Sequence, residues 1–163
     1  MIGVDLHTHS HFSDGELSPL ALLTLAQQKN IHTFALTDHD TLDGNGSAAQ
    51  AALDLGIQFI QGVEISSRWH RPSTKKSYSV HIVALNMQNL VPMQNLLDQQ
   101  QLHRAARAQL ICEKLQKVTG HDILPDVRVL VDGHDDRITR SHIAKVMVQR
   151  KMVTRLQQAF DQY

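Results

Sequence analysis

The sequence predicts an α/β domain followed by an all-helical region, and three features of the chain support this prediction. Short apolar runs alternate with helical patterns over the first 85 residues, an order typical of a parallel sheet or barrel with helices outside. Polar side chains that can bind metals follow several of the apolar runs. From about residue 90 the pattern becomes helical and rich in glutamine. We therefore expect a domain boundary between residues 88 and 89.

The first half is expected to contain four strands and two helices. Ser18 and Pro19 are suited to the cap and the first residue of a helix, and Gly56 is suited to ending the second helix. Segments 43–46 and 68–77 are rich in turn-forming or polar residues, so we expect loops there. The expected strands are residues 2–6, 31–36, 57–60 and 78–85, and the expected helices are residues 19–30 and 47–55.

The second half is expected to be entirely helical. A long helix should cover residues 91–118, with apolar residues at helical spacing and Gly120 as its terminator. Shorter helices are expected at residues 124–131, 141–150 and 153–160.

Composition excludes several classes of protein. Lys and Arg together number 16, as do Asp and Glu, so net charge gives no reason to expect strong binding to long polynucleotides or to a membrane surface. A single cysteine, Cys112, excludes an intrachain disulfide and a cysteine-rich zinc site, and its helical context predicts a buried apolar role. We identify no signal peptide and no apolar run that could span a bilayer. These features predict a cytoplasmic protein without membrane contact.

The clearest chemical signal is a His-x-His pair at the end of the first apolar run. Side chains alternate along a strand, so His7 and His9 should point to the same side. Asp14 follows five residues later and adds a carboxylate. Two imidazoles and a carboxylate are typical ligands of a divalent transition metal. The segment is therefore predicted to be part of a metal site.

More such residues follow the other predicted strands. Strand ends are where chemistry collects in parallel α/β folds, so we expect these residues to converge. Mixed imidazole and carboxylate ligands suit Zn, Mn or Fe, and clustered metals favour hydrolysis of a phosphate ester. Taken singly, each motif also fits a polar loop, a strand edge or a core histidine; their joint placement favours the metal site. The full set is His7, His9, Asp14, Asp38, His39, Asp40, Glu64 and His81.

Two residues of the helical half are candidates for substrate binding. Arg140 and His142 lie at a predicted helix start, where a phosphate is electrostatically favoured. A capped helix start that faces solvent explains them equally well, so both interpretations stay open.

The motifs together resemble the polymerase and histidinol phosphatase (PHP) superfamily of metal-dependent phosphoesterases. The resemblance covers residues 3–85 and lies in Asp-Leu-His-Thr-His-Ser with Ser-Asp-Gly, Thr-Asp-His-Asp, Gly-Val-Glu-Ile-Ser and the strand with His81. Within this superfamily, the sequence is most similar to the branch that hydrolyses nucleoside 3′,5′-bisphosphates and trims short RNA from the 5′ end. That branch inserts a helical subdomain, which residues 90–163 resemble, and residues 140–144 are similar to its Arg-x-His-Ile-Ala segment. The implied fold is a partial distorted (β/α)7 barrel over residues 1–88, followed by an all-helical insertion over residues 89–163.

The resemblance also implies roles for these residues. His7 and His9 would hold one metal, and Glu64 would bridge it to a second metal, which His81 also holds. Asp14 and His39 would serve a third metal, with Asp38 and Asp40 orienting imidazoles. Arg140 and His142 would contact substrate phosphate. A metal-activated hydroxide would then attack phosphorus.

Family members are longer and complete the barrel after the insertion, adding further metal ligands. The expectation for this chain is therefore fewer than three metals, and an open barrel edge with exposed apolar faces. A longer gene product would cover that edge, as would a homo-oligomer or a domain-swapped assembly. The implied substrates are small phosphorylated nucleotides or short RNA. Two alternatives stay open: a phosphatase for a metabolite such as histidinol phosphate, and a non-catalytic metal-binding module for interactions.

Overall fold

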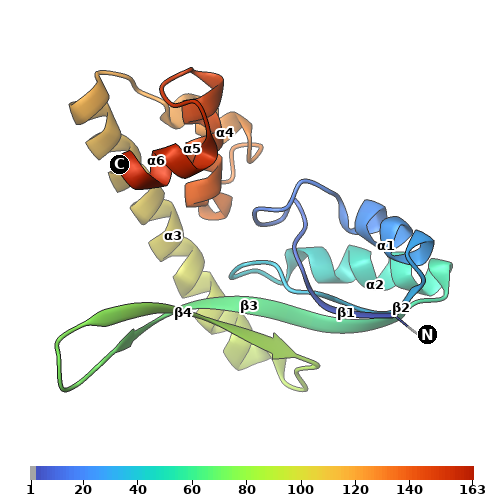
Figure 1. Cartoon of the computed structure of the whole chain (residues 1–163). Coiled ribbons are helices and arrows are strands. Elements are labelled where there is room, and N and C mark those ends of the chain that lie inside the picture. Colours follow the sequence, from blue (N-terminus) through green and yellow to red (C-terminus); the bar gives the residue numbers. More distant parts are fainter. Residues whose placement is uncertain (1–2) are drawn as a thin grey trace. The chain divides into compact units, whose positions relative to one another are not determined.

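A computed structural model describes residues 3–163 (Figure 1). The chain divides into two compact units between Gln100 and Gln101. The α/β fold class with a helical second part is confirmed. The first unit contains β1 (Gly3–Thr8), α1 (Pro19–Gln28), β2 (Ile31–Leu36), α2 (Asp43–Leu55), β3 (Gln58–His70), β4 (Ser77–Leu85) and the start of α3 (Leu90–Thr119). The second unit contains the rest of α3, α4 (Leu124–Val129), a 3-10 turn (Asp135–Arg137), α5 (Arg140–Gln149) and α6 (Leu156–Gln162). Ile2, predicted to begin the first strand, lies outside the described residues.

The sheet of the first unit is mixed. Its strand order is β1-β2-β3-β4, and β1, β2 and β3 are parallel neighbours because helices connect them. β4 pairs antiparallel with β3, because only a short turn separates the two strands. The carboxyl ends of β1 and β2 therefore lie beside the middle of β3, where Glu64 is found.

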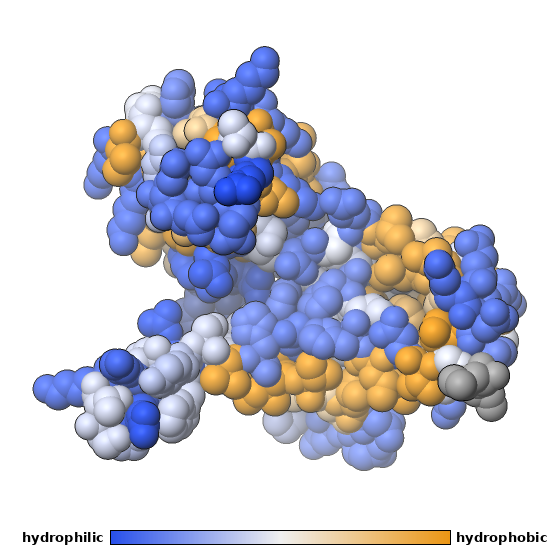
Figure 2. All heavy atoms as spheres, viewed as in Figure 1, coloured by the Kyte–Doolittle hydropathy of each residue, from blue (hydrophilic) through white to orange (hydrophobic). Residues whose placement is uncertain are grey.

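Helices α1 and α2 pack on the sheet through small apolar residues. Ala26 of α1 and Ala48 and Ala52 of α2 are buried with Phe34 and Leu36 of β2. Alanine at these positions lets the helix backbones approach the sheet closely. Other apolar side chains along the sheet stay exposed (Figure 2), including Val4, Leu6 and Ile82.

The second unit has its own core, which the four helices share. Ile123, Val127, Val146 and Met147 are almost completely buried there together with Cys112. The predicted burial of Cys112 is confirmed, and burial is the main cause that raises the pKa of its thiol to about 11.

The prediction of a turn at residues 43–46 was wrong, since α2 already begins at Asp43. The side chain of Asn45 donates to the carbonyl of Gly62 and accepts from its amide, at 3.1 Å each. Gly44 lies so close to Leu36 and Phe12 that a side chain would not fit. These tertiary contacts stabilise a helical turn where local propensity alone favours a loop.

The loop predicted at residues 68–77 was confirmed in its middle and wrong at both ends. β3 continues to His70 and β4 begins at Ser77, so only residues 71–76 form the turn. Pro72 lies in that turn, where its missing amide hydrogen removes no bond from the strand pair. The polar composition concealed a strand pair because this ribbon is exposed along its length.

The two units divide later in the chain than the predicted boundary at 88/89. The first turns of α3 belong to the first unit, since Leu97 is fully buried and Gln100 donates a 3.0 Å hydrogen bond to the carbonyl of Ser66. The remaining helix ends lie within a few residues of those predicted. Among the described residues, no helix combines the length and the apolar composition that a membrane crossing needs.

Candidate metal centre

Strand β1 delivers two imidazoles to the edge of the sheet. His7 is the penultimate residue of β1 and His9 follows its end, and their ring centroids are 5.1 Å apart. Thr8 between them points away and hydrogen-bonds to the carbonyl of Ala35 at 2.6 Å. The alternation of side chains therefore sends both imidazoles to one side, as predicted.

Strands β2 and β3 place His39 beside Glu64. The two residues pair as an isolated parallel bridge beyond the end of β2. The amide of Glu64 donates to the carbonyl of Asp38 at 3.1 Å, and the amide of Asp40 donates to the carbonyl of Glu64 at 3.0 Å. The backbone ladder itself thus fixes the position of these two side chains.

Glu64 lies at the middle of the cluster, and its two carboxylate oxygens face different imidazoles. Oε2 lies 2.8 Å from Nε2 of His7 and 3.0 Å from Nε2 of His9. Oε1 lies 2.7 Å from Nδ1 of His81. His39 approaches Oε2 at 3.6 Å through Nδ1. The Glu64 side chain is only 7% exposed, so the carboxylate is surrounded by imidazoles rather than by water.

Asp14 adds the second carboxylate. One of its oxygens lies 3.6 Å from Nδ1 of His9, and the other lies 3.8 Å from Nε2 of His39. The structure thus brings together all six residues predicted as metal ligands. They form three overlapping groups whose potential ligand atoms lie within 4.8 Å of one another: His7, His9 and Glu64; His9, Asp14 and His39; and His39, Glu64 and His81.

The electrostatic state of Glu64 reflects these neighbours. Burial raises the pKa of its carboxyl group, but the surrounding imidazoles outweigh burial and hold the pKa below its ordinary value. The imidazoles act through hydrogen bonds with His7 and His81 and through the charges of His39 and His9. Glu64 is therefore an anion prepared to meet positive charge at the centre of the cluster.

Asp38 holds the loop that follows β1. Its buried carboxylate accepts hydrogen bonds from the amide and the hydroxyl of Ser10, at 2.7 and 2.6 Å, and from the hydroxyl of Ser13 at 2.6 Å. Ser13 Oγ in turn lies 3.4 Å from Nδ1 of His9. Asp38 is thereby linked to an imidazole through a serine hydroxyl.

Asp40 fastens the next strand. It has a positive φ of 54°, which aspartate tolerates better than most residues, and its Oδ1 accepts a 2.7 Å hydrogen bond from the amide of Ser66. No role was predicted for Ser10, Ser13 or Asn45. Ser10 and Ser13 lie within the motif between His9 and Asp14, and this position could have indicated that they support the metal ligands.

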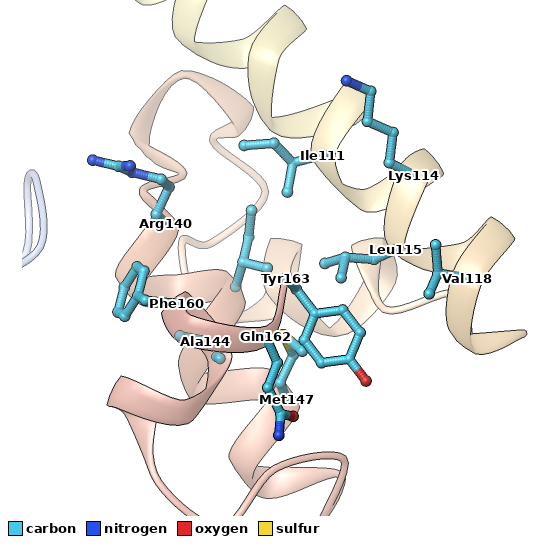
Figure 3. A pocket seen from close by; sticks show the side chains of 12 residues that line it. Ile111, Lys114, Leu115, Val118, Arg140, Ala144, Met147, Phe160, Gln162 and Tyr163 are labelled. Carbon is cyan, nitrogen blue, oxygen red and sulfur yellow. The ribbon is translucent and has the colours of Figure 1, made fainter. Parts of the chain in front are cut away.

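Arg140 and His142 lie in the second unit, so their predicted contact with substrate stays a prediction. His142 is 6% exposed and forms a capping box with Thr139, whose amide donates to Nδ1 of His142 at 3.2 Å. Arg140 borders a cavity of about 500 Å³ between α3, α5 and α6 (Figure 3). Ile111 and Phe160 contribute to its largely apolar wall.

Comparison with known proteins places the metal centre in a family context. The chain is 39% identical over 160 residues to a 5′-3′ exoribonuclease from Haemophilus influenzae, covering 98% of this chain and 55% of that protein. It is 32% identical to a 3′,5′-nucleoside bisphosphate phosphatase from Chromobacterium violaceum, covering 100% of this chain and 55% of that protein. The chain thus spans about half the length of these curated relatives.

A solved structure shows the same fold. It is described as an amidohydrolase from Chromobacterium violaceum with bound sulfate and no metal, and it superposes with a TM-score of 0.88 at 31% identity. The match covers 99% of this chain and 55% of that one. A family model for the PHP domain matches residues 5–163, which include every residue of the metal centre. The chain therefore belongs to the PHP domain family.

Proposed function

We propose that the six clustered side chains bind divalent metal ions and that the centre hydrolyses phosphate esters. The position of Glu64 supports this proposal most directly. One of its oxygens faces His7 and His9, and the other faces His81, which is how a carboxylate that bridges two cations is placed. Four imidazoles and two carboxylates also match the ligand preference of Mn, Fe or Zn.

The three overlapping groups suggest how the ligands divide. His7 and His9 would hold one ion, and His81 another, with Glu64 between them. Asp14 and His39 would serve a third position that also includes His9. Ligands from a longer chain would add to these sets.

Bound divalent ions would polarise phosphoryl oxygens and supply a nucleophile at neutral pH. The protein's own part is to fix the ligands. Asp38 accepts hydrogen bonds from Ser10 and Ser13, and these bonds keep the loop that contains Asp14 close to His9. The ladder contact between His39 and Glu64 does the same for the other two strands. Such prepositioned ligands lower the reorganisation that phosphoryl transfer requires.

The favoured substrates are nucleoside 3′,5′-bisphosphates, which would lose the 3′-phosphate, and short RNA, which would be trimmed from the 5′ end. Support comes from the names of the two relatives, since both describe hydrolysis of phosphate esters in nucleotides. The earlier alternatives, a phosphatase for a non-nucleotide metabolite and a non-catalytic metal-binding module, remain the competing hypotheses.

Metal uptake is the direct test. The purified chain is saturated with Mn²⁺ or Zn²⁺, dialysed, and its metal content measured. The wild type should retain at least one equivalent, and H7A and E64Q should retain less, because both belong to the same candidate group. His32 is an exposed histidine at the opposite end of the sheet, so H32A is the matched control and should retain the wild-type amount. Equal retention by all four proteins would refute the proposed centre.

Phosphate release then separates the competing activities. A nucleoside 3′,5′-bisphosphate should be hydrolysed faster than histidinol phosphate, and R140Q should raise the KM for the favoured substrate if Arg140 contacts its phosphate. Preference for histidinol phosphate would favour the metabolite phosphatase. Metal retention without hydrolysis of either compound would favour the non-catalytic module.

A further inference from the structure

The end of the β3–β4 hairpin extends from the metal centre as a two-stranded ribbon (Figure 1), and we refer to residues 66–81 as the arm. Ser66 pairs with His81 at its base, and His70 pairs with Ser77 at its far end. Both the arm and the metal centre belong to the first unit. The six steps along β3 from Glu64 to His70 span about 20 Å, given a strand rise of about 3.3 Å per residue.

One face of the arm is an uninterrupted row of polar side chains. Because strand residues alternate in direction, and cross-strand partners share a face, the face of Glu64 and His81 continues outward along every second residue. At the far end of the row, Ser77 Oγ lies 2.8 Å from Nδ1 of His70. The row beyond the metal ligands consists of Ser66, Arg68, His70, Ser77 and Ser79.

The opposite face of the arm has a different character. Trp69 pairs with Tyr78, and their ring centroids are 5.7 Å apart. Val80 and Ile82 continue the same face and are also exposed. The arm is therefore not polar on both faces. The continuous polar row lies only on the face that begins at the metal ligands.

The arm also concentrates positive charge in a chain whose charges otherwise balance. Arg68, Arg71, Lys75 and Lys76 are all exposed, and Figure 2 shows hydrophilic side chains around its tip. No aspartate or glutamate occurs in the sequence between Glu64 and Asp98. The arm thus contains no carboxylate that could neutralise its own cations, and a polyanion is the complementary ligand.

We propose that the polar face and the tip of the arm bind the phosphate backbone of single-stranded RNA whose terminal phosphate lies in the metal centre. This inference rests on the proposed function and extends it, because a mononucleotide could not reach from Glu64 to the tip. Hydroxyl, imidazole and guanidinium groups are suited to backbone phosphates. The row that continues from the metal ligands has no apolar side chain, and the exposed Trp69, Tyr78 and Ile82 lie on the opposite face. A strand whose end lies in the metal centre would therefore follow polar groups only, whereas a lipid surface would bind the apolar face.

The test measures binding of a 5′-phosphorylated, fluorescein-labelled oligouridylate of about ten nucleotides, a length within the range of known single-strand sites. Anisotropy is recorded in the presence of a chelator, so that the probe is not hydrolysed. The arm variant R68Q/R71Q/K76Q removes three cations. The matched control K29Q/K117Q/R155Q removes three exposed cations from outside the arm.

Each phosphate contact with a single strand contributes about 0.7 to the slope of log K against log salt, so the arm variant should flatten this slope by about 2. The control should keep the wild-type slope. Both variants should retain wild-type metal content, which shows that the first unit is folded. Equal slopes in the arm variant and the wild type would refute the proposal. So would equal, arm-dependent binding to vesicles of anionic phospholipid.

The outcome can be separated from that of the proposed function. H7A should lose metal, yet adding R68Q/R71Q/K76Q to H7A should flatten the salt slope of oligouridylate binding in chelator by the same amount as it does in the wild type. Metal uptake without arm-dependent RNA binding would overturn the role of the arm alone. RNA binding by the arm without any metal uptake would overturn the proposed hydrolytic centre and leave the arm's affinity for RNA intact.

Discussion

Replacement of Asp38 by alanine should destabilise the first unit more than the loss of any exposed carboxylate. The carboxylate is fully buried and accepts three short hydrogen bonds from Ser10 and Ser13. Alanine leaves the backbone amide of Ser10 without its acceptor, whereas the two hydroxyls can rotate towards other partners. A buried donor without a partner costs about 1–3 kcal/mol, and a lost hydrogen bond to a charged group costs about 1.5–3 kcal/mol. The two effects together give an expected loss of about 3–5 kcal/mol for D38A.

Asparagine is the informative second substitution at this position. Its amide oxygen can still accept from the Ser10 amide and the Ser13 hydroxyl, both of which bond to Oδ1 of Asp38. We therefore expect D38N to lose only about 1.5–3 kcal/mol, the value of one hydrogen bond to a charged group.

The assay is urea unfolding followed by tryptophan fluorescence. Trp69 is the only tryptophan and lies in the first unit, so its signal reports on that unit. Asp54 on α2 is exposed, and D54A should change stability by less than about 0.5 kcal/mol. If D38A unfolds within that same range, the hydrogen-bond network around Asp38 does not stabilise the fold and the reasoning fails.

Three further predictions concern other parts of the chain. Gly15 lies against the backbone of His9 so closely that a side chain has no room, so G15A should displace this loop and lower retained metal, measured after dialysis; unchanged retention would contradict the close packing. The pKa of the buried Cys112 thiol is raised from 9.0 to about 11, so the thiol ionises in the unfolded chain before it does in the folded one. Stability against unfolding should therefore fall by about 3 kcal/mol between pH 9 and 11. The urea midpoint of C112A, measured over the same pH range, should lack this fall. The pKa of Glu64 is lowered in the folded chain, so its contribution to stability is present above its unfolded pKa and is lost as pH falls through its folded pKa. In the absence of metal, the urea midpoint of E64Q should therefore fall less steeply with decreasing pH than that of the wild type.

The metal centre was predictable because its ligands occur in short local patterns. His7, His9 and His39 lie at the ends of β1 and β2, whereas Glu64 was expected after a strand and lies in the middle of β3. The spacing of His7 and His9 specifies a common side of a strand, and β2 was predicted with its observed bounds, Ile31–Leu36. Parallel strands that end at one edge then bring His39 towards Glu64. Local pattern and topology were sufficient to predict this convergence.

Other features depend on contacts that the sequence does not show. The first turn of α2 forms at a typical turn sequence because Asn45 bonds to Gly62, a residue 17 positions away. The β4 side of the arm was predicted as a strand from Tyr78, but its β3 side was not. Neither face is buried there, so Arg68 and Ser77 follow no core pattern. Strand pairing there depends on the turn and on the ladder itself.

The shared position of Glu64 has a consequence for how ions would enter and leave. Its two oxygens face different ligand groups, so two ions would share the negative charge of one carboxylate that is already held in place. The first ion would neutralise that charge, and two divalent ions beside one carboxylate repel each other. Metal should therefore leave in steps on dilution, with one position emptying at a higher metal concentration than its neighbour.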